Sequence, residues 1–288
     1  MRMPTEETHM KQMTSRRVHA GGFTTTYLEA GDPDAPTLLL MHDGAYGTDA
    51  ALCWGDVITD LQRDHHILAP DMLGWGGSAK VCFFDRSPYD FRLEHIGAFL
   101  RTLEVTEPVV AVGSSFGAEI VVRGTAMPEW GWKVRGAVAI AGTGGRMFRV
   151  PGGIEQLGDY EPSLEAAARI TSMLVDSTSG MDEHIRQRFQ NSLTPGHWEA
   201  LSALRLRNPA VERNIAPDSW PEPLGSCAAP IHFVEGARDP LLESGWAASM
   251  AAVTLHGTSE VVEGSHEPNL DHPNEIADLV RSFVARLR

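Results

Sequence analysis

Short apolar runs rich in β-branched residues recur along the chain, each followed by a glycine-bearing loop and then by a stretch with helical spacing. Runs that are apolar on both faces suit strands buried between two layers of helices, as in a parallel sheet. The predicted strands are residues 23–29, 37–42, 66–71, 109–113, 137–141, 231–235 and 260–263. The predicted helices are residues 50–63, 91–104, 116–127, 241–252 and 274–287.

This alternation stops between residues 145 and 226, where helical segments lie among glycine and proline and no buried-strand run occurs. We therefore expect an α/β fold with a mostly parallel central sheet flanked by helices. Residues 1–144 and 227–288 would form this core, with residues 145–226 as a helical lid. A separate second domain is the alternative, but the strand pattern resumes afterwards with too little sequence to fold alone.

Composition and charge exclude several classes of binding partner. Of the 288 residues, 42% are hydrophobic, which is enough for a large core, and the formal net charge of -14 would repel nucleic acid and anionic membranes. No apolar run reaches the length of a signal peptide or of a membrane span. Cys53, Cys82 and Cys227 are too few and too widely spaced for a disulfide scaffold. We expect a cytoplasmic protein with reduced thiols and no nucleic-acid or membrane partner.

The strongest motif is Gly-Ser-Ser-Phe-Gly at residues 113–117, which matches G-x-S-x-G between a predicted strand and a predicted helix. The turn at such a site is too tight for side chains two positions either side of the serine, which explains both glycines. The serine is then presented above the carboxyl edge of the sheet. Ser114 lacks the flanking glycines, so the pattern predicts Ser115 as the nucleophile. A glycine-rich turn with incidental serines is the alternative.

A serine nucleophile needs a base to take its proton and an acid to orient that base. In this kind of fold they follow in the order serine, acid, histidine, at the ends of later strands. Asp239 and His266 each lie in the loop after a predicted strand, in that order. Glu235 competes with Asp239 but lies within its strand. His272 competes with His266, but it stands at the start of the last helix, where a capping or surface role is favoured.

Acyl transfer also needs backbone N–H groups that stabilise the developing oxyanion. One donor is expected to be the N–H of Phe116, the residue after the nucleophile. The other is expected in the loop after residues 37–42, with Gly44 as the first choice and Ala45 next. A plain turn is the alternative for this loop, and His42 is expected to support it rather than act on substrate.

With these residues the chain resembles the α/β-hydrolase superfamily along nearly its whole length. The resemblance rests on the loop at residues 42–44 and the elbow, and on PDMLGWGGSAK at 70–80, EGARDP at 235–240 and EGSHEPNLDHP at 263–273. The segment PDMLGWGGS is most similar to the carbon–carbon bond hydrolases that cleave ring-fission products of aromatic catabolism, and to related small-molecule esterases. The resemblance implies a helical lid over an apolar pocket above Ser115 and a small, largely apolar substrate.

Two departures from those carbon–carbon hydrolases bear on the substrate. They usually carry a glycine-rich oxyanion loop, whereas Asp43 replaces its first glycine here and Tyr46 stands near its proline. They also commonly have tryptophan after the catalytic histidine, where this chain has Glu267. We expect Asp43, at the pocket mouth, to disfavour an anionic substrate. The candidate pocket residues are Asp43, Ala45, Met147, Phe148 and Trp220, although apolar residues at helical spacing are often plain core.

The sequence thus predicts a serine hydrolase that cleaves a carboxylic ester or similar acyl bond through an acyl-enzyme. Carbon–carbon cleavage of a vinylogous diketone is the alternative among enzymes, and a non-enzymatic ligand receptor on the same fold is the alternative outside them. We expect no metal, because His266-Glu267 lacks the second histidine of H-E-x-x-H, and no other cofactor, because no G-x-G-x-x-G follows the first strand. A second copy of the chain remains a candidate partner.

Overall fold

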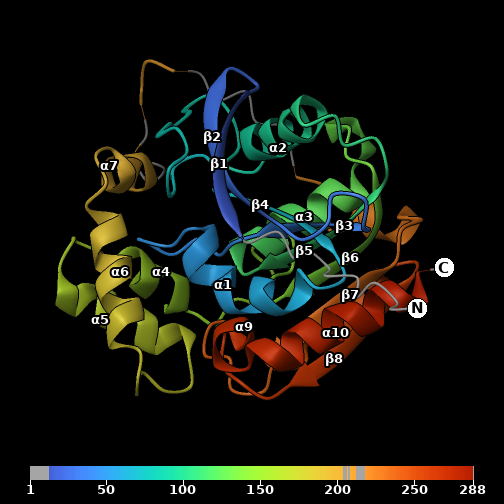
Figure 1. Ribbon diagram of the computed structural model, residues 1–288. Coiled ribbons are helices and arrows are strands. Elements are labelled where there is room, and N and C mark those ends of the chain that lie inside the picture. The colour runs from blue at the N-terminus through green and yellow to red at the C-terminus, as the bar shows by residue number, and fades with distance from the viewer. Residues whose placement is uncertain (1–12, 204–205, 207, 212–217, 288) are drawn as a thin grey trace, which may run out of the picture.

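The central element is an eight-stranded sheet with the strand order β1-β2-β4-β3-β5-β6-β7-β8 (Figure 1). The computed structural model describes residues 13–203, 206, 208–211 and 218–287. Strands β3 to β8 run parallel to one another, whereas β2 lies antiparallel to both β1 and β4. The strands are β1 (Thr14–Ala20), β2 (Phe23–Ala30), β3 (Thr37–Met41), β4 (His66–Pro70), β5 (Val109–Ser114), β6 (Val134–Ile140), β7 (Ile231–Gly236) and β8 (Gly257–Val262).

The helices connect these strands and cover the sheet. They are α1 (Ala50–Leu61), α2 (Asp90–Thr102), α3 (Phe116–Ala126), α4 (Gly153–Gly158), α5 (Leu164–Leu174), α6 (Asp182–Ser192), α7 (His197–Ser202), α8 (Trp246–Val253), α9 (Pro268–Asp271) and α10 (Pro273–Arg286), with short 3₁₀ turns at Pro128–Trp130 and Glu222–Ser226. All residues of β4, β5 and β7 are buried, as the runs of apolar residues predicted.

The strand order reverses direction between β3 and β5, and this sets which helix covers which face. From β3 the chain passes through α1 to β4 on one side, and from β4 it crosses back through α2 to β5 on the other side of β3. Because crossovers between parallel strands are right-handed, α1 covers one face while α2 and α3 cover the other. Ligands of such sheets bind at the carboxyl ends of the strands at this reversal. The loops after β3 and β5 are therefore the first place to look for a site.

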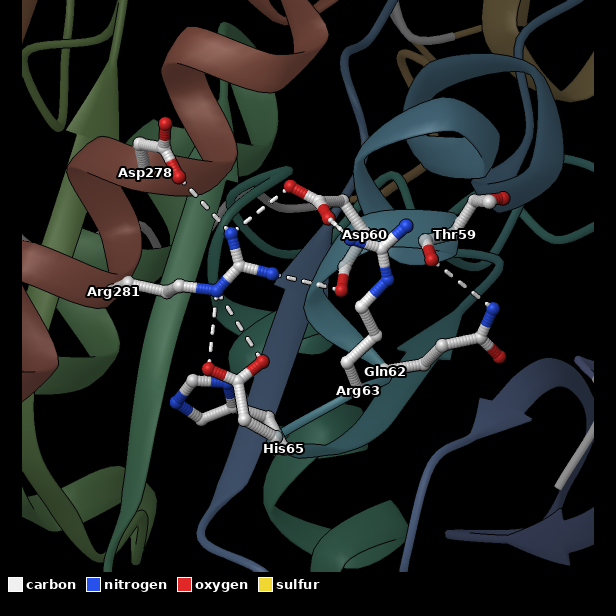
Figure 2. Close-up of polar contacts among 8 residues, drawn as sticks. Thr59, Asp60, Gln62, Arg63, His65, Asp278 and Arg281 are labelled. Atoms are coloured by element: carbon white, nitrogen blue, oxygen red, sulfur yellow. Dashed lines mark hydrogen bonds and ion pairs between the residues drawn. The ribbon is translucent and has the colours of Figure 1, made fainter. Parts of the chain in front are cut away.

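Helix α10 packs against α1 on the first face, and the two lie side by side in Figure 1. Arg281 of α10 fastens this contact: its guanidinium donates to Asp60 at 2.9 Å and to Asp64 at 3.0 Å, near the end of α1. It also pairs with Asp278 at 3.1 Å on its own helix, and Figure 2 shows the group between Asp60 and Asp278. Arg281 holds the pKa of Asp60 below its ordinary value.

The described part of the segment between β6 and β7 holds the helices α4 to α7 and no named strand. These helices gather at one side of the sheet in Figure 1. The helical character predicted for residues 145–226 agrees with this arrangement. The predicted boundaries at residues 1 and 288, and residues 204–205, 207 and 212–217 of the predicted lid, lie outside the described residues.

Strand β1 and the start of α8 differ most clearly from the sequence prediction; β6 and β8 also begin three residues before their predicted starts, and α9 was not predicted. Strand β1 was not predicted because its residues are mostly polar and exposed, and it pairs with β2 alone at the edge of the sheet. The predicted helix at 241–252 begins only at Trp246, so that prediction was wrong at its start. Gly245, with φ of 85°, precedes the helix, and the carboxylate of Glu235 accepts the backbone N–H groups of Gly245 and Ala247 at this end.

Candidate active site

Ser115 lies between the last residue of β5 and the first residue of α3, in the sharp turn that the sequence predicted. Its φ of 51° is in the left-handed region, which a non-glycine residue adopts only under strain. The two glycines make the turn feasible. A Cβ on Gly113 would lie 2.4 Å from the backbone carbonyl carbon of Gly117, and a Cβ on Gly117 would lie 2.2 Å from the carbonyl oxygen of Met41 in β3.

His266 and Asp239 complete a chain of contacts with Ser115. The Nε2 atom of His266 lies 2.8 Å from the Ser115 hydroxyl oxygen, and its Nδ1 atom lies 2.9 Å from both carboxylate oxygens of Asp239. Both side chains are about 2% exposed. An Nδ1–H that donates to Asp239 leaves Nε2 as an acceptor for the serine proton. The structure thus brings together the three residues predicted from chain order.

The loops after β7 and β8 position this pair. Asp239 follows β7, and its Oδ1 also accepts the backbone N–H of Leu241 at 2.8 Å. Glu235, the rival acid, instead caps α8 by accepting the N–H groups of Gly245 and Ala247, and within the described part of the chain it forms no hydrogen bond with His266. His272, the rival base, stands at the N-cap of α10 and is about one third exposed. The geometry favours Asp239 and His266 over both rivals.

The loop after β3 carries Gly44, the residue predicted to provide the second oxyanion donor. Gly44 lies against Phe116, since a Cβ on Gly44 would lie 2.7 Å from the Phe116 Cβ. Phe116 is the first residue of α3, where a backbone N–H has no acceptor within the helix. The residues of the two predicted donors, Gly44 and Phe116, are therefore neighbours. Asp43 holds the loop from within by accepting the N–H of Ala45 at 2.7 Å and the Thr48 hydroxyl.

His42 and Asp71 hold the loops beside the site in place through hydrogen bonds. His42 donates from Nδ1 to the carbonyl of Asp43 at 2.6 Å and accepts the Met72 N–H at Nε2, and burial lowers its pKa. Asp71 accepts the N–H groups of Ala50 and Gly77, which ties the loop after β4 to the start of α1. The contacts of His42 agree with the supporting role expected for it, and Asp71 has a structural role of the same kind.

A cavity of about 580 Å³ opens above Ser115. Its lining includes Asp43, Gly44, Ala45 and Phe116. Its other walls come from the loop before α2 and from the helices of the 145–226 segment, and include Trp75, Tyr89, Ile154, Leu157, Leu174 and Leu201. Apolar side chains of α4, α5 and α7 therefore face the nucleophile.

Met147, Phe148 and Trp220 do not line this cavity, so the expectation for these three residues is corrected. The indole of Trp220 donates to the carbonyl of Thr143 at 2.8 Å and packs against Gly144. Met147 and Phe148 are half-buried and pack against the core. Local packing, rather than apolar character, therefore decides which side chains of this segment reach the cavity.

Sequence reasoning missed two polar groups beside the nucleophile. Glu119 of α3 accepts the Tyr89 hydroxyl at 2.6 Å and pairs with Arg149 at 2.9 Å, and all three line the cavity. Asn269 accepts the Ser114 hydroxyl at 3.1 Å and donates to the carbonyl of Cys53 at 2.9 Å. The signal for Asn269 was its place three residues after His266.

Comparison with known proteins identifies the family. A family described as the alpha/beta hydrolase family matches residues 38–279. The chain belongs to the alpha/beta hydrolase family. It is 26% identical, over 94% of its length, to 2-hydroxymuconate semialdehyde hydrolase of Pseudomonas sp. (strain CF600), and the match covers 93% of that protein. It is 23% identical, again over 94%, to 2-hydroxy-6-oxo-6-(2'-aminophenyl)hexa-2,4-dienoic acid hydrolase of Metapseudomonas resinovorans, 91% of which is covered.

Solved structures of this alpha/beta hydrolase family share the fold. The meta-cleavage product hydrolase from Pseudomonas fluorescens IP01 superposes with a TM-score of 0.82 at 20% identity, and covers 95% of this chain and 98% of its own. The relatives confirm the similarity to carbon–carbon bond hydrolases that the sequence indicated, and the protein is a hydrolase of this family. No helix in the described ranges is long and apolar enough to cross a membrane.

Proposed function

We propose that the protein cleaves an acyl bond of a small, largely apolar carbonyl compound through nucleophilic attack by Ser115. The observation that carries this proposal is the chain of contacts from Ser115 through His266 to Asp239, at 2.8 Å and 2.9 Å, beneath the 580 Å³ cavity. A hydroxyl in contact with a buried imidazole that is oriented by a carboxylate is arranged for acyl transfer.

In the proposed mechanism, His266 takes the proton of Ser115 as the hydroxyl attacks the substrate carbonyl. The backbone N–H groups of Gly44 and Phe116 stabilise the oxyanion that forms, and Asp239 stabilises the imidazolium. His266 then returns the proton to the leaving fragment, which leaves an acyl-enzyme on Ser115. A water molecule, deprotonated by His266, releases the acid and restores the serine.

We further propose a carbon–carbon bond as the bond cleaved, because the relatives that match over most of this chain are named for hydrolysis of ring-fission products. In such a substrate the electron pair of the broken bond passes to carbon. A 2-hydroxy-dienoate must first move its enol proton to the carbon beside the carbonyl that is attacked, which turns the enol into a conjugated ketone. This ketone can then hold the electron pair of the broken bond as an enolate, which takes up the proton that His266 returns. The largely apolar walls from Ile154, Leu157 and Leu201 suit a hydrocarbon substituent on the acyl side.

A carboxylic ester of a neutral acid is the second candidate. It is favoured by Asp43, a buried acidic residue of the cavity lining beside Ser115, whose negative charge would repel a substrate carboxylate. The relatives are named for an acid and a semialdehyde. The charge of Asp43 is therefore the feature expected to distinguish an anionic substrate of that kind from a neutral ester.

We further propose a lid and a cellular compartment for the enzyme. Residues 145–226 would act as a lid over the core formed by 1–144 and 227–288, since α4, α5 and α7 supply cavity walls. The buried thiols of Cys53 and Cys227 fit a reducing cytoplasm.

The test is a substrate panel with the purified protein: neutral esters of graded acyl length beside 2-hydroxy-6-oxo-dienoates with alkyl and aryl substituents. Carbon–carbon hydrolysis predicts loss of the dienoate chromophore with kcat/KM at least about tenfold above that of the best ester, a difference of about 1.4 kcal/mol in transition-state binding. Turnover of esters alone would instead establish the second candidate.

A further inference from the structure

The cavity above Ser115 has a polar patch in its otherwise largely apolar wall. The patch consists of Tyr89, Glu119, Arg146 and Arg149, which all line the cavity. Tyr89 stands at the start of α2, Glu119 lies on α3, and the two arginines lie in the segment between β6 and α4. Three parts of the chain thus contribute to the patch, and no step of the proposed mechanism uses it.

Glu119 is fully engaged by two neighbours. One carboxylate oxygen accepts the Tyr89 hydroxyl at 2.6 Å, and the other accepts Nη2 of Arg149 at 2.9 Å. Burial and the charge of Glu119 raise the pKa of Tyr89 well above its ordinary value, so the hydroxyl keeps its proton and remains the donor. The side chain of Glu119 is only 9% exposed. Both of its oxygens are therefore occupied within the cavity wall.

The two arginines of the patch can still be reached from the cavity. Arg149 donates to Glu119 through Nη2, and its side chain is 27% exposed. Arg146 is exposed and, within the described part of the chain, its side chain forms no hydrogen bond or ion pair. Glu155, a further acid of the lining, is exposed on α4, where water and salt screen its charge. The patch thus sets two guanidinium groups against the single carboxylate of Glu119.

The ion pair of Glu119 and Arg149 is an unusual component of an apolar wall. Burial of an ion pair costs desolvation, and well-packed apolar residues in its place are often equally stable or more stable. Apolar side chains such as Ile154, Leu157 and Leu201 already line the same cavity. Recognition of a charged substrate group would account for the pair, because guanidinium groups bind carboxylates through short, charge-assisted hydrogen bonds.

The sheet places the two arginines and Asp43 on opposite sides of the nucleophile. Strand β5, which leads to Ser115, lies between β3 and β6 and runs parallel to both. Asp43 is in the loop after β3, whereas Arg146 and Arg149 follow β6. Negative charge on the β3 side and positive charge on the β6 side would orient an anionic substrate with its charge toward β6.

We propose that Arg146 and Arg149 form a carboxylate-binding subsite, and that the substrate carries a carboxylate on the fragment that lies on the β6 side of Ser115. This inference rests on the proposed function of Ser115. Ile154 and Leu157 line the same cavity, so an apolar chain separates this carboxylate from the reacting carbonyl. Glu119 is a positioning residue that orients the guanidinium of Arg149. The charge of Asp43 disfavours the reversed orientation.

The test compares two trifluoromethyl ketones of the same chain length, one ending in a carboxylate and the other in a methyl group. Such ketones add reversibly to an active-site serine, and each inhibition constant follows from how far the ketone slows fluorophosphonate labelling of Ser115. The assay requires no knowledge of the bond that is cleaved. At the best chain length, wild type is expected to bind the carboxylate ketone about tenfold more tightly than the methyl ketone, as for one hydrogen bond between charged groups.

Substitutions in the patch are expected to change this ratio in opposite directions. Arg149→Gln should lower it about tenfold, and Arg146→Gln about threefold because that residue is exposed. Arg149→Lys keeps the charge and should retain most of the ratio. Glu119→Gln removes the carboxylate that competes for Arg149 and should raise the ratio. A merely structural role of the ion pair would instead weaken the binding of both ketones alike in Arg149→Gln and Glu119→Gln.

Two further variants serve as controls. Glu119→Gln/Arg149→Gln leaves no carboxylate of the pair behind, so a loss of the ratio in this protein cannot come from repulsion by Glu119. Arg186→Gln alters an exposed arginine of α6 that is outside the cavity lining, and it should keep the wild-type ratio.

Equal binding of the two ketones by wild type at every chain length would overturn the inference. So would a preference for the carboxylate ketone that persists in folded Arg146→Gln/Arg149→Gln protein. A folded wild-type protein that does not label at Ser115 would contradict the proposed function instead, so the two failures are distinguishable.

Discussion

The imidazole Nε2 of His266 lies 2.8 Å from the hydroxyl oxygen of Ser115, although the two residues are 151 positions apart in the chain. The contact exists because β5 and β8 run parallel and end at the same edge of the sheet, with β6 and β7 between them. The loop after each strand then carries one of the two groups. The fold itself therefore creates the proposed nucleophile–base pair.

Removing either member of this pair is expected to abolish turnover while the fold remains. Ser115→Ala and His266→Ala should each lower kcat by at least about 10³-fold, because the proposed acyl-enzyme then cannot form. The measurement is steady-state kinetics on the best substrate of the panel, with circular dichroism as the check on folding. Turnover near the wild-type rate in either folded variant would contradict the proposed mechanism.

Asp239 and Glu235 can be separated by a matched pair of amide substitutions. Asp239→Asn is expected to lower kcat about 10⁴-fold with little change in Tm, because it disturbs the imidazole tautomer. Glu235→Gln is expected to keep kcat and to lower stability by about 1–2 kcal/mol, because two backbone N–H groups at the start of α8 lose a carboxylate. The reverse outcome would make Glu235 the orienting acid.

Gly44→Ala tests the proposed oxyanion donors. The new methyl group would meet the Phe116 Cβ at 2.7 Å, which must push the two backbone N–H groups apart. Loss of one donor is expected to lower kcat about 10²-fold, or about 3 kcal/mol. Gly55→Ala is the control, because a Cβ on Gly55 meets nothing within 4 Å. If Gly44→Ala and Gly55→Ala have the same kcat, the Gly44 N–H does not stabilise the oxyanion.

Asp43→Asn tests which substrate class the cavity accepts. Removal of the buried negative charge is expected to raise kcat/KM for anionic substrates relative to neutral ones by about tenfold, as like-charge repulsion is lifted. The experiment compares one ester bearing a carboxylate with one uncharged ester of the same length. An equal change in kcat/KM for both esters would show that Asp43 does not discriminate between charged and neutral substrates.

Arg281→Ala tests the contact between α10 and α1 shown in Figure 2. A partly exposed ion-pair network of this size contributes about 1 kcal/mol, and high salt should reduce it. Because Arg281 lowers the pKa of Asp60, the contribution is present above the ordinary carboxyl pKa of about 4 and is lost as pH falls through the lowered value.

Thermal melts of wild type and Arg281→Ala across pH 3 to pH 7 therefore should converge toward the acidic end. Arg186→Ala, which breaks an exposed pair within α6, is the matched control and should change Tm less. A Tm difference that is constant over this pH range would show that Arg281 acts through packing of its stem rather than through charge.

The parts of the fold that burial dictates could be predicted from sequence. β4, β5 and β7 are buried on both faces, so their apolar runs were plain, and the elbow glycines follow from the tight packing of residues 113–117 against β3. Strand β1 could not be predicted, because an exposed edge strand of polar residues leaves no hydrophobic alternation.

Within the candidate site, chain order led to Ser115, Asp239 and His266, because each follows a strand. The cavity walls were harder to predict. Trp220 and Phe148 have the same apolar character as Leu157 and Leu201, and only the packing of α4 and α7 decides which side chains reach the cavity.

The most direct test of the central claim is peptide mapping by mass spectrometry of wild-type protein after reaction with a fluorophosphonate. We predict a single adduct on Ser115, absent from Ser115→Ala and strongly reduced in His266→Ala. Ser114 is the informative neighbour, because its hydroxyl donates to Asn269 at 3.1 Å and is not the one in contact with His266. An adduct on Ser114, or no adduct on folded wild-type protein, would contradict the assignment of Ser115 as the nucleophile.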